Sequence, residues 1–182
     1  MSVSIQRARD ILRHAELLYS AEQVQTALHR VAEQINGALC DKHPLVLSVM
    51  GGAAVFSGQL LPLLDFPLEF DYVHVSRYGD ARQGGAMHWK VAPCENVRGR
   101  VVLLLDDILY EGHTLAALRD RVLQLGAAKC YSAVFAEKDR ARKAARADFV
   151  GLEVPNRFVF GYGMDIEGAW RNLPAIYAVK DE

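Results

Sequence analysis

The chain has 182 residues, 51% of them hydrophobic, and a formal net charge of −1 at pH 7. This length is typical of a single domain, and the apolar fraction is large enough for a sizeable buried core. Acidic and basic residues are mixed along the sequence, which argues against nucleic acid or an anionic membrane as the main partner.

Helix-like and strand-like patterns alternate along the chain. The first helix is indicated by apolar residues at helical spacing, and the second follows a capping-box pattern at Ser20–Gln23. In chain order, we expect helices at 5–18, 24–39, 53–64 and 115–125, the last closed by Gly126, and strands at 45–49, 68–76, 100–105 and 131–136. Short elements are expected near Phe149, Phe158 and Ile176, but the sequence does not predict which strands they pair with. Strands that are apolar on both faces and alternate with helices indicate an α/β fold with a mostly parallel sheet covered on both sides.

A glycine-rich segment at 79–86 lies between Tyr78 and Trp89. It offers little apolar surface to bury and has high backbone freedom. A plain hairpin loop and a lid that closes over a reaction would have the same composition, and both interpretations stay open.

The chain ends and the cysteines favour a cytoplasmic protein. Residues 1–7 lack the apolar run of a secretory signal, and no stretch approaches the roughly 20 apolar residues that a membrane helix needs. Cys40, Cys94 and Cys130 are odd in number and far apart, so we expect free thiols.

The most informative stretch is 101–115, where two adjacent acids, Asp106 and Asp107, end a buried strand. Ligands of open α/β sheets bind at this end of the strands. A short loop with Gly112 and Thr114 then opens a helix, whose N–H groups and dipole suit a phosphate. Side chains of successive strand residues point to opposite faces, so at least one acid should face the crevice. An ordinary turn with acids near a helix N-terminus would have the same pattern. The spacing excludes a P-loop and a dinucleotide-binding loop.

The stretch 103–115 closely resembles the phosphoribosyl-pyrophosphate signature of type I phosphoribosyltransferases, with an apolar strand, two acids, two apolar residues and a Gly-x-Thr loop. Further stretches between about 45 and 171 are similar, in the same order, to the hypoxanthine-guanine phosphoribosyltransferase family. The resemblance implies one domain over 1–182, a twisted parallel sheet flanked by helices, with a core at about 45–150 and a small hood from about 1–40 and 151–182.

The implied reaction is purine salvage with magnesium. A 6-oxopurine, hypoxanthine or guanine before xanthine, would take the phosphoribosyl group of 5-phosphoribosyl pyrophosphate (PRPP) and give the nucleoside monophosphate, IMP or GMP, and pyrophosphate. The family also implies a homodimer or homotetramer. From the mixed charges and the lack of a membrane segment, we expect no nucleic acid and no membrane among the partners.

The resemblance assigns the phosphoribosyl end of the site. Asp106 and Asp107 would bind the ribose hydroxyls, and both would help Asp165 to hold Mg²⁺. The loop from Tyr110 to Thr114 would wrap the 5′-phosphate, with Glu111 turned outward and the other members being Gly112 and His113. Met50 and Gly51 match the family's pyrophosphate loop, in which a cis peptide turns amides toward the diphosphate. Many members carry lysine at the position of Met50.

Other stretches match the base and the lid. Arg77 and Tyr78 resemble the start of the family's catalytic loop, which is usually Ser-Tyr. Lys138 matches the lysine that contacts the 6-oxo group, although the basic run 138–146 is otherwise most simply a solvated face. Phe158 would stack on the purine, Val159 would offer backbone groups to its edge, and Arg171 would bind pyrophosphate. Trp170, next to Arg171, is expected to serve packing.

Tyr110 departs from the family, in which an aspartate handles the proton on purine N7. A tyrosine, with a reference pKa near 10, does not normally accept that proton, and loss of a general base typically costs about 10²–10⁴-fold in rate. A protein that senses nucleotide or PRPP without turnover, or a phosphoribosyltransferase for adenine or a pyrimidine, would also fit this departure.

Overall fold

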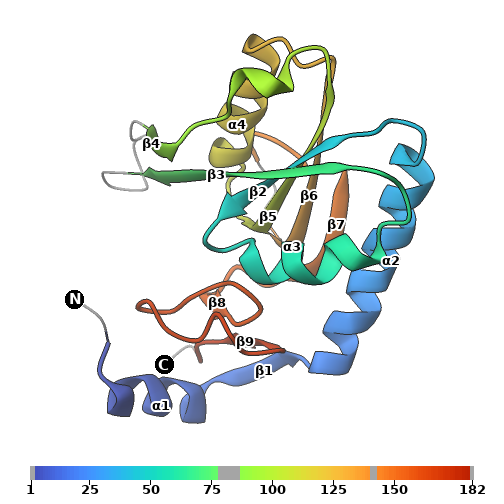
Figure 1. The fold of residues 1–182 in the computed structure, drawn as a ribbon. Coiled ribbons are helices and arrows are strands. Elements are labelled where there is room, and N and C mark those ends of the chain that lie inside the picture. The colour runs from blue at the N-terminus through green and yellow to red at the C-terminus, as the bar shows by residue number, and fades with distance from the viewer. Residues whose placement is uncertain (1–2, 78–86, 140–142, 181–182) are drawn as a thin grey trace.

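The computed structural model describes residues 3–77, 87–139 and 143–180 and contains a six-stranded central sheet (Figure 1). The strand order is β4-β3-β2-β5-β6-β7, and every neighbouring pair is parallel except β3 with β4 at one edge. The bounds are β2 Leu45–Met50, β3 Glu69–Arg77, β4 Met87–Val91, β5 Val101–Leu109, β6 Lys129–Lys138 and β7 Phe149–Val154. The mostly parallel α/β sheet predicted from the sequence is confirmed.

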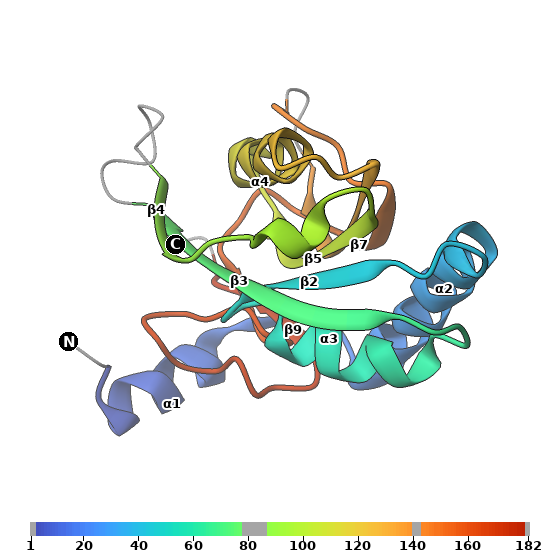
Figure 2. The ribbon, with the colours of Figure 1, turned by 45° about the horizontal axis from the view of Figure 1, so that its top comes forward.

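Helices cover both faces of this sheet, as Figure 2 shows. On one face, α2 (Ala21–Leu39), α3 (Ala54–Leu60) and the 3-10 turn η1 (Leu61–Leu63) pack against alternate residues such as Leu103 and Leu105. On the other face, α4 (His113–Gln124) packs against Val102 and Leu104. A second 3-10 turn, η2 (Glu95–Val97), precedes β5. Because both faces are buried, the central strands are mostly apolar, with buried Ser48 and Ser132 as polar exceptions.

A second, smaller sheet forms the hood and has the order β1-β9-β8. Its strands are β1 Glu16–Tyr19, β8 Val159–Phe160 and β9 Ile176–Ala178, all antiparallel, and α1 (Ile5–His14) precedes β1. Figure 1 shows this sheet and α1 lying together beside the core, with the chain's first and last described segments meeting there.

Three differences from the predicted boundaries affect how the fold is divided. The first helix ends at His14 rather than at 18, because Ala15 is extended and β1 pairs with β9 instead of continuing the helix. β5 runs four residues beyond Leu105, since Ile108 and Leu109 still pair with β6. α2 and β7 belong to the core, with α2 packed on the core cluster, so the hood consists of residues before 20 and after 154. The capping box at Ser20 and Gln23 is present.

Cys40 and Cys94 are exposed, Cys130 is buried, and all three are free thiols, as predicted. Burial raises the pKa of Cys130 to about 11. Across the described parts of the chain, none of the helices combines the length and apolar character needed to span a membrane.

Candidate active site

A cleft of about 390 Å³ lies between the carboxyl ends of two core strands and the hood. β5 and the loop after it contribute Asp107, Ile108 and Tyr110, and β6 contributes Lys138. The hood contributes Phe158, Val159, Met164 and Asp165. The structure therefore brings together six of the residues singled out from the sequence. Ile108 and Met164 were missed, because an apolar residue at either position carries no chemical signal beyond core packing.

The two adjacent acids are held by backbone hydrogen bonds at the end of β5. The Asp106 carboxylate accepts the N–H of Asp107 at 3.0 Å, and the Asp107 carboxylate accepts the N–H of Ile108 at 2.8 Å. Burial raises the pKa of Asp106 well above its usual range, and the charge of Asp107 adds to the effect. Burial also raises the pKa of Asp107, but a hydrogen bond with Asp106 and the charge of Arg171 oppose it. Asp107 is thus the acid better able to remain a carboxylate and accept hydrogen bonds in the cleft.

The conformation of the loop after β5 requires a glycine at position 112. Gly112 precedes α4 with a φ of +78°, and a Cβ there would lie 2.7 Å from the backbone N and O of Ala145. The same neighbouring segment donates the N–H of Ala144 to the carbonyl of Glu111 at 2.8 Å. The loop is thereby held at the N-terminus of a 12-residue helix, where N–H groups and the dipole favour an anion.

Three side chains predicted in this loop lie at different depths. Thr114 is half-buried in the first turn of α4, and His113 is exposed. Glu111 is half-buried rather than turned fully outward, with its carboxylate 3.9 Å from His113 Nε2.

Close backbone packing links the loop after β2 to Asp107 and to the hood. The Met50–Gly51 peptide is cis. A Cβ on Gly52 would lie 1.9 Å from Asp107 Oδ2, and a Cβ on Gly163 would lie 2.1 Å from the carbonyl oxygen of Gly52. Asp107, the backbone of Gly52 and the backbone of Gly163 therefore pack against one another in that order, with no room for a side chain on either glycine.

On the hood side, Arg171 organises the loop that carries Asp165. Its guanidinium pairs with Asp165 Oδ1 and donates to the carbonyl of Gly163 at 2.6 Å. Asp165 Oδ2 accepts the N–H of Gly168 at 2.8 Å. Trp170, next in the chain, donates its Nε1–H to the carbonyl of Ala8 in α1 at 2.7 Å, so it holds α1 on this loop.

Aromatic and basic groups surround the remaining space. Phe158 is 55% exposed, which is unusual for a phenylalanine and leaves its ring face available, whereas Val159 is buried in β8. Lys138 lies over the ring of Tyr110, with Nζ 4.5 Å from the ring centroid. The basic run is not simply a solvated face: Lys143 pairs with Glu137 at 2.9 Å, and the two side chains are only 12% and 19% exposed.

The residues predicted at the start of the lid are not among those that line the cleft. Arg77 ends β3, where its backbone pairs with Met87. Tyr78 and the glycine-rich segment 79–86 lie outside the described residues. The lid predicted there remains a prediction.

The acids predicted as metal ligands do not form a cage. Among residues 3–77, 87–139 and 143–180, no three His, Cys, Asp or Glu side chains are grouped to hold a metal ion. Asp107 and Asp165 line the same cleft, but Asp106 is not part of its lining. Two carboxylates at one cleft suit a magnesium ion that takes its other ligands from substrate oxygens and water.

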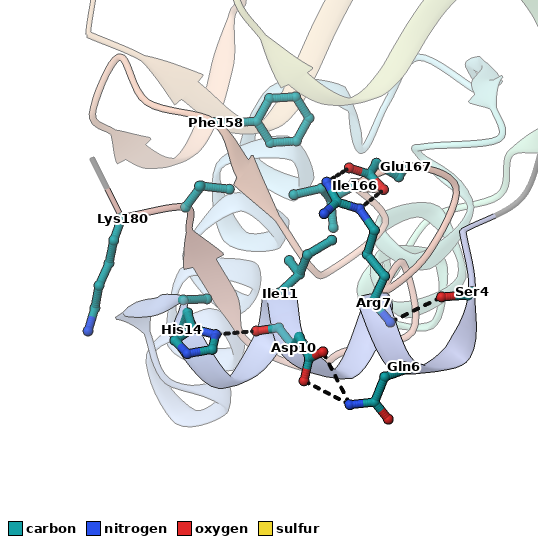
Figure 3. A pocket seen from close by; sticks show the side chains of 12 residues that line it. Ser4, Gln6, Arg7, Asp10, Ile11, His14, Phe158, Ile166, Glu167 and Lys180 are labelled. Atoms are coloured by element: carbon teal, nitrogen blue, oxygen red, sulfur yellow. Dashed lines mark hydrogen bonds and ion pairs between the residues drawn. The ribbon is translucent and has the colours of Figure 1, made fainter. Parts of the chain in front are cut away.

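A larger groove of about 1120 Å³ lies on the side of the hood that faces α1, and Figure 3 shows it. Arg7 and Asp10 of α1 line it, with Glu167 opposite and Phe158 at its edge. Arg7 is bound to Glu167 by two hydrogen bonds of 2.8 and 2.6 Å. The groove contains neither the acid pair nor the N-terminus of α4, so the chemistry belongs to the smaller cleft.

Comparison with known proteins agrees with this geometry. A model of the phosphoribosyl transferase domain matches residues 14–167. The chain is 31% identical to a hypoxanthine-guanine phosphoribosyltransferase of Streptococcus pneumoniae, over 92% of this chain and 94% of the relative. It is 32% identical to a hypoxanthine-guanine-xanthine phosphoribosyltransferase of Tritrichomonas foetus, over 91% of each. The crystal structure of a Bacillus anthracis hypoxanthine-guanine phosphoribosyltransferase superposes with a TM-score of 0.85 at 28% identity, over 91% of this chain and 98% of the other.

Proposed function

The chain belongs to the hypoxanthine-guanine phosphoribosyltransferase family, and on that premise we propose that its cleft transfers the phosphoribosyl group of PRPP to hypoxanthine or guanine. The products would be IMP or GMP and pyrophosphate. The observation that carries the proposal is the meeting, in one cleft, of Asp107 from the core with Lys138 and the exposed ring of Phe158. An acid for sugar hydroxyls, a cation and an aromatic platform are the groups that a phosphoribosyl donor and an oxopurine require together.

The phosphoribosyl group would lie on the core. The N-terminus of α4 and the loop from Tyr110 to Thr114 would hold the 5′-phosphate through N–H groups. Asp107, together with the neighbouring Asp106, would accept hydrogen bonds from the ribose hydroxyls. The backbone at Met50 and Gly51 and the guanidinium of Arg171 would meet the diphosphate, whose charge an arginine binds well.

The base would lie between the core and the hood. Phe158 would stack on the purine and Lys138 would donate to its 6-oxo group, which together orient the ring nitrogen toward C1 of the ribose. That nitrogen forms the new bond to C1 while the bond from C1 to pyrophosphate breaks, and the electron pair leaves with pyrophosphate. The proton of the purine's imidazole ring leaves to water, because Tyr110, unlike an aspartate, does not accept it at neutral pH. The carboxylate of Asp107 is suited to stabilise positive charge that develops on the ribose.

Magnesium is part of the proposal. Asp165 and Asp107 are the residues that would hold it, together with oxygens of PRPP and water. When bound, it neutralises charge on the pyrophosphate leaving group. The proposal also includes a cytoplasmic location and assembly as a homodimer or homotetramer, which sedimentation of the purified protein would test.

The test is pyrophosphate release from PRPP with magnesium, with hypoxanthine, guanine, xanthine and adenine offered separately. We expect release that depends on an oxopurine and falls at least about 10²-fold in Asp107→Asn. Asp120→Asn, an exposed acid on α4, is the matched control and should behave as wild type. Tight nucleotide binding without release for any base would contradict the enzyme and identify a sensor. Release with adenine alone would contradict the oxopurine specificity.

A further inference from the structure

The segment between β6 and β7 packs against the loop that precedes α4. The N–H of Ala144 donates to the carbonyl oxygen of Glu111 at 2.8 Å. A Cβ on Gly112 would lie 2.7 Å from the backbone N and O of Ala145. The backbone that leads into the N-terminus of α4 therefore rests directly on the backbone of these two alanines.

This segment is attached to β6 at two points, one on each side of the alanines. On one side, Lys143 Nζ lies 2.9 Å from Glu137 Oε1. On the other side, Asp148 Oδ2 accepts the N–H and the hydroxyl of Ser132 at 2.8 and 2.9 Å. We call residues 143–148 the brace. Because both attachments are made to a buried strand, the two alanines cannot move away from the loop unless one of these contacts breaks.

The pair of Lys143 with Glu137 is the attachment that lies next to the cleft in the sequence, since Glu137 directly precedes Lys138, which lines the cleft. The side chains of Lys143 and Glu137 are only 12% and 19% exposed, so water screens their attraction much less than it screens a surface pair. Removal of one partner would leave the other charge poorly hydrated and uncompensated. The pair therefore fixes the brace more firmly than a surface ion pair would.

We propose that Lys143 and Glu137 are positioning residues for the 5′-phosphate of PRPP. They act through the brace, which fixes the backbone of Glu111 and Gly112 and thereby aims the N–H groups at the N-terminus of α4. The inference rests on the proposed function, in which this loop holds the 5′-phosphate. The base is held by other segments, so only ligands that carry a 5′-phosphate should feel the loss of the pair.

The experiment is a double-mutant cycle that measures GMP binding and steady-state kinetics. Lys143→Met and Glu137→Gln should each raise the Kd of GMP and the KM of PRPP about tenfold, less than the roughly 10²-fold cost of an ångström of misplacement. The KM of hypoxanthine should stay unchanged. The double variant should be no worse than either single variant, because the two residues act as a pair. Lys143→Arg keeps the charge and should restore GMP binding.

Arg100→Met is the matched control. Arg100 pairs with Glu69 at 2.7 Å, and its side chain is 21% exposed. Glu69 begins β3, so this pair lies at the end of the sheet opposite to the N-terminus of α4. The variant loses an ion pair of similar length and should lower Tm without changing the Kd of GMP.

Several results would overturn the inference. An unchanged Kd of GMP in the variants would do so, as would an equal rise in the KM of hypoxanthine, or an equal loss of GMP binding in Arg100→Met. Independent effects of the two substitutions in the double variant would contradict action as a pair. The double variant leaves neither charge unpaired, so it decides the matter even if a single substitution prevents folding. A wild type that binds GMP but releases no pyrophosphate would contradict the proposed transfer alone.

Discussion

The core and the hood are built in different ways. The core strands are nearly fully buried, as in β2 and the first part of β5, and are held by many equivalent apolar contacts. The hood strands have only four, two and three residues, and the loop between β8 and β9 contains Tyr162, Glu167 and Trp170 with positive φ. Isolated elements this short are not stable by themselves. The hood therefore keeps its shape through a few specific contacts with its surroundings.

Tyr162 is the deepest of these contacts. Its ring is fully buried with its centroid 4.2 Å from that of Phe135 in β6, and its hydroxyl donates to Gln59 Oε1 in α3 at 3.0 Å. The difference between the two regions predicts where the enzyme is vulnerable. Substitutions at the junction should disturb catalysis most, those inside the core should act on stability, and those at the outer side of the hood should act weakly.

The largest effect is expected at Gly163, where the hood touches the core. Gly163 has a φ of +99°, and a Cβ would lie 2.1 Å from the carbonyl oxygen of Gly52, which is backbone and cannot rotate away. Gly163→Ala should separate the hood from the loop after β2 by roughly an ångström or less. Misplacement of this size costs about 10²-fold in rate, and kcat/KM for PRPP should fall accordingly.

The control for this prediction is Gly168→Ala in the same loop. Gly168 also has a positive φ, of +83°, but a Cβ there has nothing within 4 Å. This substitution tests the effect of backbone strain without a close approach to another part of the backbone. The variant should retain most of its activity. Equal losses in the two variants would show that strain, and not contact between hood and core, limits the enzyme.

A second prediction concerns Asp106, a buried acid of the core. Its pKa is raised in the folded state, so the folded protein binds a proton more tightly than the unfolded chain does. Its contribution to stability is therefore greatest below the ordinary aspartate pKa and declines as pH rises to the raised pKa. Asp106→Asn should abolish this decline, raise Tm at neutral pH by roughly 2–4 °C for each kcal/mol recovered, and reduce activity.

Thermal unfolding between about pH 4 and pH 8 measures the effect. The Asn side chain can still accept the N–H of Asp107, so the local hydrogen bond survives. Asp120→Asn on the surface of α4 is the control and should leave the pH profile unchanged. A profile of Asp106→Asn parallel to that of wild type would contradict the raised pKa of Asp106.

The same contrast explains what could be predicted from the sequence. The core was predictable because burial on both faces leaves continuous apolar runs, and because Asp106 and Asp107 interrupt one of them at its end. The contact between Gly52 and Gly163 could not be predicted. Where two backbones lie close together, the sequence shows only a glycine at each position, and nothing in it shows that the two glycines meet. The pairing of β1 with β9 joins residues 16–19 to 176–178. Segments this short have no hydrophobic periodicity from which their pairing could be predicted.

The neighbourhood of Lys138 illustrates the same limit within the site. Its place after β6 was visible in the sequence, and the family resemblance gave it a role. Its contact with Tyr110 depends on the register of β5 against β6, which becomes known only when β5 is seen to extend to Leu109. The ion pair of Lys143 with Glu137 was likewise hidden in what looked like a charged surface.

A smaller effect is expected where α1 is attached to the rest of the hood. Trp170→Phe removes the hydrogen bond to the carbonyl of Ala8 and keeps most of the packing. Loss of one such bond, worth about 1 kcal/mol, should loosen the loop that carries Arg171 and raise the KM of PRPP by up to about fivefold. The KM of the base should stay constant, because Phe158 and Lys138 are not on this loop. Trp89→Phe in β4 is the control, and an equal change there would contradict a role for α1.

The smallest effect is expected at Arg7, the outermost contact of the hood, which Figure 3 shows bound to Glu167. The pair is exposed, so water and salt screen it, although the pKa of Glu167 is lowered by its hydrogen bond with Arg7. Arg7→Gln should raise the KM of PRPP no more than about twofold, and the change should vanish near about 1 M salt. Arg13→Gln is a close match, because Arg13 is as exposed on the same helix but pairs with Asp10 of α1 itself. An equal rise of the PRPP KM in Arg13→Gln would mean that α1 acts through its overall charge. A rise in Arg7→Gln alone would mean that α1 acts on the rest of the hood through the pair of Arg7 with Glu167. A loss larger than that of Trp170→Phe would contradict the expected order and place the main support of the hood on its outer side.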